Sequence, residues 1–103
     1  MIEATSEQHV KEIIATADPD HWVVLYFWAP WCSVCTNSQL PILTMFDEKN
    51  DNVTIVKVNV DDVPEPALDN GVRALPTFIF IRNNEQKIRV GLTGIKNLQQ
   101  VID

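Results

Sequence analysis

The sequence predicts an α/β fold in which a central mixed β-sheet is flanked by helices. Two apolar segments of strand length, 22–28 and 53–60, alternate with helical patterns, which is typical of parallel strands joined by crossover helices. Two further β-rich segments, 77–82 and 86–90, are separated by only three residues, which is too short for a crossover and indicates an antiparallel hairpin. With 103 residues, the chain is expected to form one domain, 1–103.

The first third of the chain is expected to contain an edge strand, a helix and a buried strand. Residues 2–4 are interpreted as the short edge strand. Thr5 is expected to cap the helix, because Gln8 follows three residues later as in a capping box, and the turn residues 18–20 end it. The segment 22–28 is a continuous apolar run, which indicates a central strand covered on both faces.

Two more helices are predicted before the hairpin and one after it. The first begins near Cys32 and is expected to bend at Pro41, because proline removes a backbone hydrogen bond and its ring crowds the preceding turn. The second covers 64–70, and Gly71 suits the position that follows its end. The last is predicted from an apolar stripe at Ile95, Leu98, Val101 and Ile102. The predicted order is therefore (β)αβαβαββα.

Composition and charge exclude several classes of protein. Hydrophobic residues make up 46% and charged residues 21% of the chain, which excludes a disordered protein, a collagen and a coiled coil. Acidic residues outnumber basic ones by 14 to 8, so we expect no direct binding to nucleic acid. No apolar run approaches the roughly 18 residues that span a bilayer, and residues 1–7 do not resemble a signal peptide. We expect a cytoplasmic monomer that does not associate with a membrane.

The chain has two cysteines, Cys32 and Cys35, between the predicted central strand and a helix. A bridge between them closes a loop of only four residues, for which loop entropy gives about 2 kcal/mol, so stabilisation alone does not explain the spacing. At a helix N-terminus Cys32 faces unpaired N–H groups and the positive end of the helix dipole, which favour its thiolate. We therefore expect Cys32 to attack and Cys35 to resolve the mixed disulfide. A structural zinc site needs four ligands, and the other candidates, His9 and His21, lack ligand spacing, so no metal is expected.

Four parts of the sequence, each on the element where it is expected, are similar to parts of a known family. They are the segments 27–35, 56–61 and 72–77 and Gly91. The first looks like the active-site motif of the thioredoxin family. The others look like its third strand, the loop that carries its cis-proline and the glycine after its last strand. The chain thus resembles that family over nearly its whole length, which implies the thioredoxin fold and a thiol–disulfide oxidoreductase.

The resemblance implies an enzyme that reduces protein disulfides and needs no cofactor beyond its redox-active Cys32–Cys35 disulfide. The surface that receives a substrate polypeptide would consist of Trp31, Leu75, a cis Pro76 and Gly91. Trp28 would pack beneath the site with Asp61 near it, and Lys57 would lie behind the cysteines. The implied partners are disulfide-containing proteins and a thioredoxin reductase or an equivalent electron donor, because the sequence has no nucleotide or flavin fingerprint.

The residues between the cysteines depart from the family's usual Gly-Pro, because Ser33 and Val34 stand there instead. Unlike proline, Val34 offers a backbone N–H near the helix start, and the Ser33 hydroxyl is a second donor. Both would stabilise the Cys32 thiolate. Since a stabilised thiolate favours the reduced form, we expect the pair to be more oxidising than a pair with Gly-Pro.

Two further departures concern the region behind Cys35. Tyr26 stands where the family has a buried aspartate that is taken to be the base for the second cysteine, so Lys57 lacks its usual acidic partner. Tyr26 and Lys57 are therefore expected to tune the redox chemistry. A phenol with an ordinary pKa of about 10 stays protonated at neutral pH and cannot replace that base. Pro41 lies six residues after Cys35, where the family has five.

Two other functions are compatible with these residues. In a protein-binding module, such as a polymerase accessory subunit, the surface around Trp31 and Pro76 would dock a partner and the thiols would be incidental. A disulfide oxidase or isomerase would differ from a reductase only in its redox poise.

Overall fold

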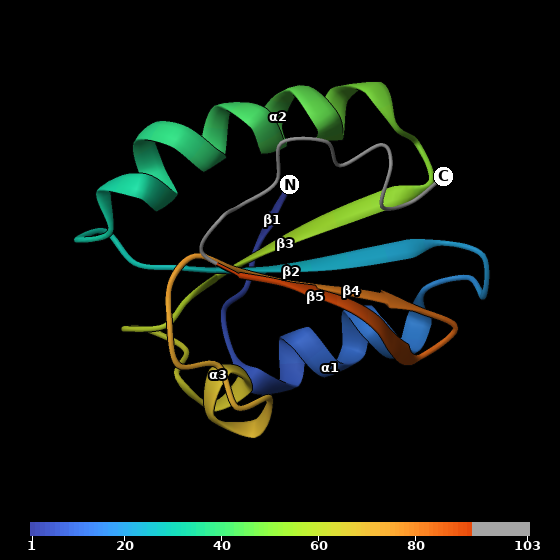
Figure 1. Cartoon of the computed structure of the whole chain (residues 1–103). Helices are drawn as coiled ribbons and strands as arrows, with labels where there is room; N and C mark the ends of the chain where they lie inside the picture. The colour runs from blue at the N-terminus through green and yellow to red at the C-terminus, as the bar shows by residue number, and fades with distance from the viewer. Residues whose placement is uncertain (92–103) are drawn as a thin grey trace.

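The computed structural model describes residues 1–91, and within them a five-stranded mixed sheet forms the centre of the molecule (Figure 1). In spatial order the strands are β1 (Ile2–Glu3), β3 (Val53–Asn59), β2 (Trp22–Trp28), β4 (Thr77–Arg82) and β5 (Glu85–Val90). β3 lies parallel to both β1 and β2, whereas β4 runs antiparallel to both β2 and β5. The predicted mixed sheet is therefore confirmed, and so is the short edge strand near the N-terminus.

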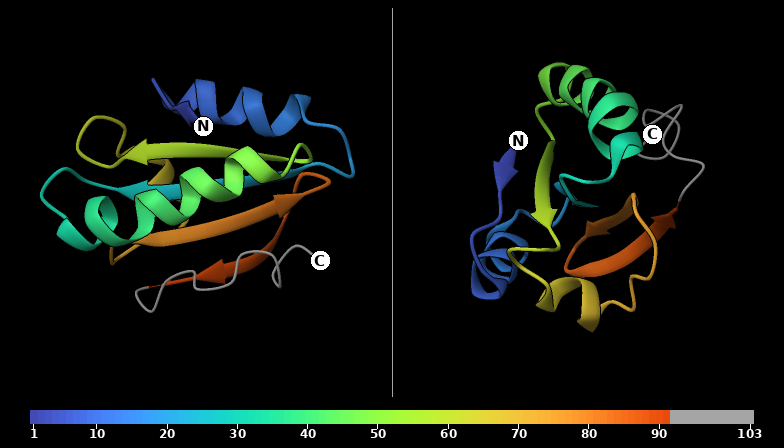
Figure 2. Two further views of the ribbon diagram at one scale, coloured as in Figure 1. Left: turned by 90° about the horizontal axis from the view of Figure 1, so that it is seen from above. Right: turned by 90° about the vertical axis from the view of Figure 1, so that its left-hand side faces the viewer.

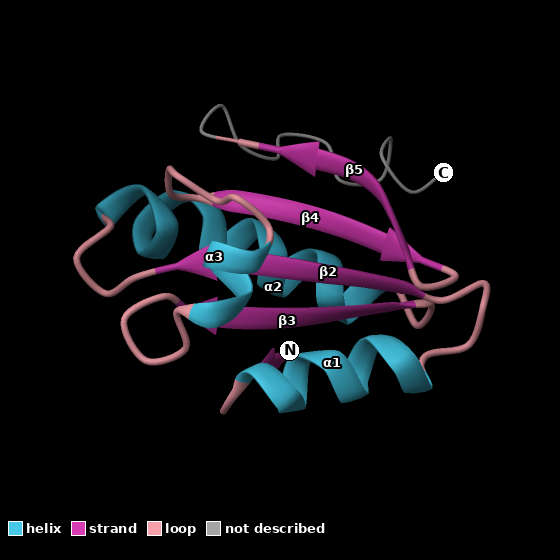
Figure 3. Ribbon diagram, turned by 90° about the horizontal axis from the view of Figure 1, so that it is seen from below, coloured by secondary structure: helices cyan, strands magenta, loops and turns pink. Residues whose placement is uncertain are grey.

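Helices cover both faces of this sheet (Figures 1 and 2). On one face the π-helix η1 (Val34–Gln39) continues into α2 (Leu40–Lys49), and on the other lie α1 (Glu7–Thr16) and α3 (Glu65–Asp69). Figure 3, seen from below, shows α1 and α3 in front of the strands and α2 behind them. The predicted order of elements is confirmed as far as β5. The predicted last helix, with Ile95, Leu98, Val101 and Ile102, lies outside the described residues.

The side chains of β2 contribute to both halves of the core, because successive residues of a strand point to opposite faces. Tyr26 packs with Phe78 and with Leu43 of α2. Phe27 packs in the opposite layer with Val58, against α1 and α3. Every residue of β2 except its last one is buried, so the prediction of a central strand covered on both faces is confirmed.

The N-terminus of α1 differs from the expectation, because the cap is Ser6 and not Thr5. The Ser6 hydroxyl accepts a hydrogen bond from the N–H of His9 at 3.0 Å. The His9 ring in turn accepts from the N–H of Thr5 at 3.0 Å, so two backbone donors are satisfied reciprocally, as in a capping box. The expectation for Thr5 is wrong because the ring of His9 takes the accepting role that the sequence pattern assigns to Gln8.

Replacing Ser6 with alanine is expected to lower the free energy of unfolding by about 1 kcal/mol, because an N-cap hydroxyl contributes roughly 0.5–2 kcal/mol. Urea titration followed by circular dichroism measures this change. Thr5→Ala is the matched control, since it removes an exposed hydroxyl that contacts the His9 ring at 3.2 Å and leaves both backbone hydrogen bonds in place. Equal destabilisation by the two substitutions would contradict the assignment of the cap to Ser6.

The helix after the cysteines changes type before it reaches Pro41. In η1 the N–H of Leu40 donates to the carbonyl of Cys35, five residues earlier, whereas an α-helix would join residues four apart. Pro41 then lies in the first turn of α2. The helix therefore has a wide turn directly ahead of the proline. This wide turn accommodates the six-residue spacing between Cys35 and Pro41.

Two turns match the residues that the sequence places in them. Gly71 follows α3 with a φ of 64°, in the left-handed region where a glycine is unstrained, which confirms its predicted position. Asn83 and Asn84 both have positive φ, at 55° and 60°, as a two-residue hairpin turn requires. The predicted hairpin is confirmed, and β5 begins one residue earlier than the sequence pattern indicated, at Glu85.

Candidate redox-active site

Cys32 and Cys35 are joined by a disulfide at the junction between β2 and η1, with their Cα atoms 5.3 Å apart. Cys32 is 9% exposed and Cys35 is fully buried, so only the first sulfur lies near the surface. The N–H of Cys35 donates to Sγ of Cys32 at 3.3 Å. Ser33 and Val34 are exposed between them. This arrangement offers one thiol to an incoming molecule and holds the second one behind it.

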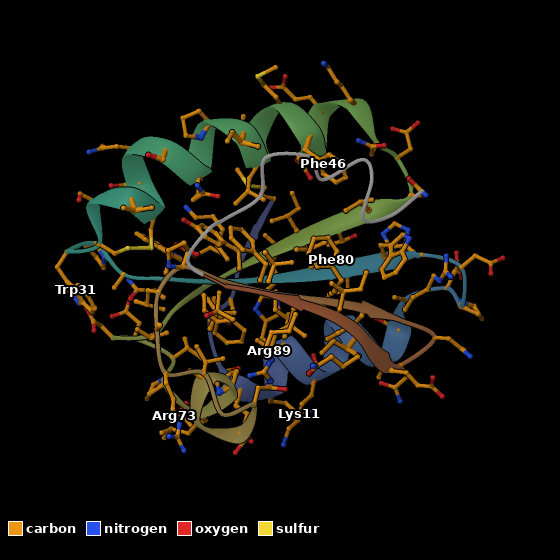
Figure 4. All side chains as sticks on the ribbon, viewed as in Figure 1. Lys11, Trp31, Phe46, Arg73, Phe80 and Arg89 are labelled. Atoms are coloured by element: carbon orange, nitrogen blue, oxygen red, sulfur yellow. A yellow bond between two sulfur atoms is a disulfide. The ribbon has the colours of Figure 1, made fainter. Side chains whose placement is uncertain are left out.

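Trp31 is the most exposed aromatic side chain near the disulfide, at 69% exposure, and Figure 4 shows it at the same end of the molecule. Its indole Nε1 donates to the carboxylate of Asp61 at 3.1 Å. The resemblance placed Asp61 near Trp28, whereas in the structure the Asp61 carboxylate is hydrogen-bonded to Trp31. Nε1 of Trp28 is buried and has no hydrogen-bond partner among residues 1–91.

A groove of about 200 Å³ has Trp31 in its wall and is lined mainly by apolar side chains. The other lining residues are Val60, Ala67, Val72, Arg73, Ala74 and Leu75. The peptide bond between Leu75 and Pro76 is cis, as the resemblance implied, and Pro76 is buried. Gly91 is exposed after the end of β5 and does not line the groove.

The groove contains residues that the sequence reasoning missed. Three of them, Val72, Arg73 and Ala74, lie in the loop before the expected cis-proline, so their position in the sequence could have indicated a place in the groove. Val60 follows β3, and the carboxyl ends of parallel strands meet at one edge of a sheet, so it too could have been found. Nothing in the local sequence indicated Ala67, because its position depends on how α3 packs against the sheet.

Tyr26 lies directly behind the cysteines. It is 1% exposed, its ring stacks on Phe78 with centroids 5.0 Å apart, and its hydroxyl donates to the carbonyl of Cys35 at 2.5 Å. Burial raises the pKa of the Tyr26 phenol above its ordinary value, so it stays protonated at neutral pH. It can therefore donate a hydrogen bond but cannot accept a proton from a thiol.

Lys57 is the register partner of Tyr26 on β3, so both side chains point to the same face of the sheet. Its Nζ lies 4.6 Å from the ring centroid of Trp28, within the range of a cation–π interaction. In the part of the chain that the structure describes, no carboxylate forms a salt bridge with Lys57. Lys57 thus contacts the Trp28 ring in place of an acidic partner.

The buried phenol predicts a loss of stability at high pH. A group whose folded-state pKa is raised contributes its full stability below its unfolded pKa, here about 10, and loses it as the pH rises toward the folded value. We expect the free energy of unfolding to fall by about 1.4 kcal/mol per pH unit above pH 10 from this group. Urea titrations from about pH 9 to pH 11, compared with Tyr26→Phe, isolate the contribution.

The chain contains a single tyrosine, so tyrosinate absorbance reports on Tyr26 alone. This absorbance should appear together with unfolding and not before it. Ionisation near pH 10 in the folded protein, or equal pH dependence in Tyr26→Phe, would contradict the expectation.

The described residues show no other candidate for chemistry of this kind. Among residues 1–91, no group of three His, Cys, Asp or Glu side chains is placed to hold a metal ion. His21 instead contacts the hydroxyl of Thr54 at 2.7 Å, and His9 takes part in the cap of α1. No helix within this range is long and apolar enough to cross a membrane.

Comparison with known proteins gives one consistent result. A family model for thioredoxin matches residues 1–103. The thioredoxin of Chlamydia caviae is 32% identical over 102 residues, which cover 99% of this chain and 93% of that protein. The thioredoxin of Rickettsia typhi is 37% identical over 78 residues, which cover 74% and 73%. Among solved structures, the reduced thioredoxin pre-protein of Schistosoma mansoni has a TM-score of 0.87 at 31% identity, covering 98% of this chain and 93% of that one.

Proposed function

Because the chain belongs to the thioredoxin family, we propose that Cys32 is the attacking thiol and Cys35 the resolving thiol in its reduction of protein disulfides. The activity itself follows from the family and from the bonded cysteine pair: the chain is a thiol–disulfide oxidoreductase. The observation that carries the division of roles is the difference in burial, since only Cys32 reaches the surface.

The proposed reaction has two steps and balances without a cofactor. The Cys32 thiolate attacks one sulfur of a substrate disulfide, so that the substrate's S–S bond breaks and its other sulfur leaves and takes up a proton. The Cys35 thiolate then attacks Sγ of Cys32, which breaks the mixed disulfide and releases the second substrate thiol. Two electrons pass to the substrate, and the chain is left with the Cys32–Cys35 disulfide.

Backbone groups support the first step. The N–H of Cys35 points at Sγ of Cys32, so in the reduced protein it would donate to the Cys32 thiolate. A hydrogen bond to a charged group contributes roughly 1.5–3 kcal/mol, which lowers the pKa of a thiol by about one to two units. Ser33 and Val34 would add donors at the same helix start, so we propose that the pair is more oxidising than one with Gly-Pro.

The groove supports a polypeptide substrate. Trp31, which donates a hydrogen bond to Asp61, and Leu75, which precedes the cis peptide bond, both line it. We propose that an extended segment of the substrate lies along it with its disulfide at Cys32. The electron donor would be a thioredoxin reductase or an equivalent protein. We propose the cytoplasm as the location, since a dithiol that must be returned to its reduced form requires a reducing compartment.

Reduction of insulin disulfides with dithiothreitol as electron donor tests the function. The wild-type chain should accelerate the reaction, and the variant with Cys32→Ser and Cys35→Ser together should not. Binding of a partner protein that survives both substitutions would instead point to a binding module. The family findings do not favour that alternative or an oxidase.

A further inference from the structure

Two features that the sequence presents separately meet at one atom of the structure. The carbonyl oxygen of Cys35 accepts a hydrogen bond from the Tyr26 hydroxyl at 2.5 Å and another from the N–H of Leu40. The first partner stands in place of the expected aspartate, and the second belongs to the wide turn that accommodates the extra residue before Pro41. Cys35 is fully buried, so water does not compete for this oxygen.

We infer that Tyr26 is a positioning residue for the resolving step: its hydroxyl fixes the backbone of Cys35 and thereby holds Sγ of Cys35 against Sγ of Cys32. The inference rests on the proposed role of Cys35 as the resolving thiol. Tyr26 contacts neither the substrate nor a reacting atom, and it acts through the peptide group that carries the thiol.

The backbone of Cys35 is held on both sides. Its N–H donates to Sγ of Cys32 at 3.3 Å, and its carbonyl accepts from Tyr26 and from Leu40. The Cα atom between these groups therefore has little freedom to move, and the direction of its side chain is fixed with it. Without the hydroxyl, the carbonyl depends on the single hydrogen bond inside the π-helix.

Tyr26 is itself held in place by the residues packed around it. It lies on the central strand β2, between β3 and β4, with its ring stacked on Phe78 at an interplanar angle of 14°. The side chain spans the layer between the sheet and η1, so the hydroxyl ties the helix to the sheet at Cys35. A shorter side chain on the same strand would leave that carbonyl with one partner.

A donor is needed at this point because of the wide turn. A π-helical turn is a rare geometry that persists where the surroundings support it. A hydroxyl donates to the Cys35 carbonyl, whereas an ionised carboxylate only accepts and would leave that carbonyl without a second donor. The tyrosine thus fits the six-residue spacing in a way that the family's aspartate does not.

Positioning affects both the rate and the equilibrium of the second step. When the Cys35 thiolate attacks Sγ of Cys32, the bond between Cys32 and the substrate breaks, and the substrate sulfur leaves with the electron pair and takes up a proton. The effective concentration of Cys35 at Cys32 sets how fast this happens and how far the intramolecular disulfide is favoured. It does not affect the earlier attack by Cys32 on the substrate.

The test compares Tyr26→Phe with the wild type in three measurements. The equilibrium constant for forming the Cys32–Cys35 disulfide against glutathione should fall by about threefold to tenfold. A tenfold fall corresponds to a potential about 30 mV higher. The mixed disulfide between Cys32 and glutathione should persist longer by a similar factor. The alkylation rate of Cys32 in the reduced protein should not change.

Thr44→Val is the matched control. The Thr44 hydroxyl donates to the carbonyl of Leu40 at 2.9 Å, so the substitution removes a hydroxyl-to-carbonyl hydrogen bond from the same helix. It leaves both donors to the Cys35 carbonyl, the Tyr26 hydroxyl and the N–H of Leu40, in place. It should destabilise the fold like Tyr26→Phe and leave both thiol measurements unchanged. Substitution of Tyr26 with 3-fluorotyrosine, which keeps the hydroxyl, should retain wild-type values.

Carbonyl ¹³C labelling of cysteine gives a direct structural readout, because the chain contains only two cysteines. Tyr26→Phe should shift the resonance of Cys35 and leave that of Cys32 in place. Unchanged thiol equilibrium and unchanged mixed-disulfide lifetime would overturn the inference, and so would equal effects of Thr44→Val. A wild-type chain that fails to reduce insulin would instead refute the proposed function.

Discussion

Cys35→Ser is expected to convert the enzyme into a trap for its substrates. Cys32 can still attack a disulfide, but no second thiol is present to break the mixed disulfide that results. Incubation of the reduced variant with insulin, or with a cell extract whose protein disulfides are intact, should yield covalent adducts that dithiothreitol releases. Mass spectrometry of the adducts should place every linkage at Cys32, because it is the one cysteine of the two that this variant retains.

Cys32→Ser is the matched control, since it removes the more accessible sulfur and leaves the fully buried one. It should form no adduct and reduce insulin no faster than dithiothreitol alone. The loss in rate should be large, because catalysis through this pair depends on a covalent intermediate. Adducts that form in Cys32→Ser through Cys35, with none in Cys35→Ser, would reverse the assignment of the two thiols.

The sequence predicted those parts of the fold that depend on local pattern. The apolar run of β2 must be buried on both faces of the sheet, and it is. This prediction did not depend on how the neighbouring helices pack. The hairpin of β4 and β5 follows from Asn83-Asn84, since asparagine tolerates the positive φ that the turn needs. Both features are determined by residues adjacent in the chain.

Features that depend on competition between neighbours were predicted less well. Thr5 and Ser6 offer equivalent hydroxyls one residue apart, and the choice between them is made by the ring of His9. The resemblance implied a place for Asp61 near Trp28, and its carboxylate instead accepts a hydrogen bond from the exposed indole of Trp31. In each case the outcome depends on which side chain the rest of the fold brings into reach, and the local pattern does not contain that information.

The candidate site likewise has features that the local sequence predicted and features that it did not. The spacing of the two cysteines indicated the chemistry, because bridging needs only adjacent turns of one helix. The roles of Tyr26 and of the six-residue spacing before Pro41 could not be predicted from the sequence. Each was a separate departure from the family's usual sequence, with no sign that the two are connected. The structure joins them at the carbonyl of Cys35, where a hydrogen bond from β2 meets one from the π-helix.

Tyr26→Asp is expected to speed the resolving step although it destabilises the fold. A buried carboxylate behind Cys35 can accept the thiol proton, and general-base assistance is typically worth 10²–10⁴-fold. The lost positioning of Cys35 removes part of that gain, so we expect the mixed disulfide to resolve at least about tenfold faster per folded molecule at pH 7. Stopped-flow measurement of substrate release from the mixed disulfide gives this rate.

The cost in stability has two sources. Removing a ring that is 1% exposed and stacked on Phe78 costs about 3–5 kcal/mol, as for other buried aromatic residues replaced by small ones. Burial would also raise the pKa of the new carboxyl above its unfolded value of about 3.9. The folded variant would then be most stable below that value and would lose stability as the pH rises through the raised pKa. Lys57, its register partner, would offset part of this loss.

Tyr26→Asn separates the two effects, because it leaves the same space and cannot act as a base. It should lose the same contribution from the ring, show no added pH dependence of stability from position 26, and resolve the mixed disulfide more slowly than the wild type. The ratio of the Asp to the Asn rate at pH 7 is therefore the measure of the restored base. Equal rates in the two variants would mean that the Cys35 proton passes to water or to the leaving thiolate of the substrate, and that this chain never needed the carboxylate that its tyrosine replaces.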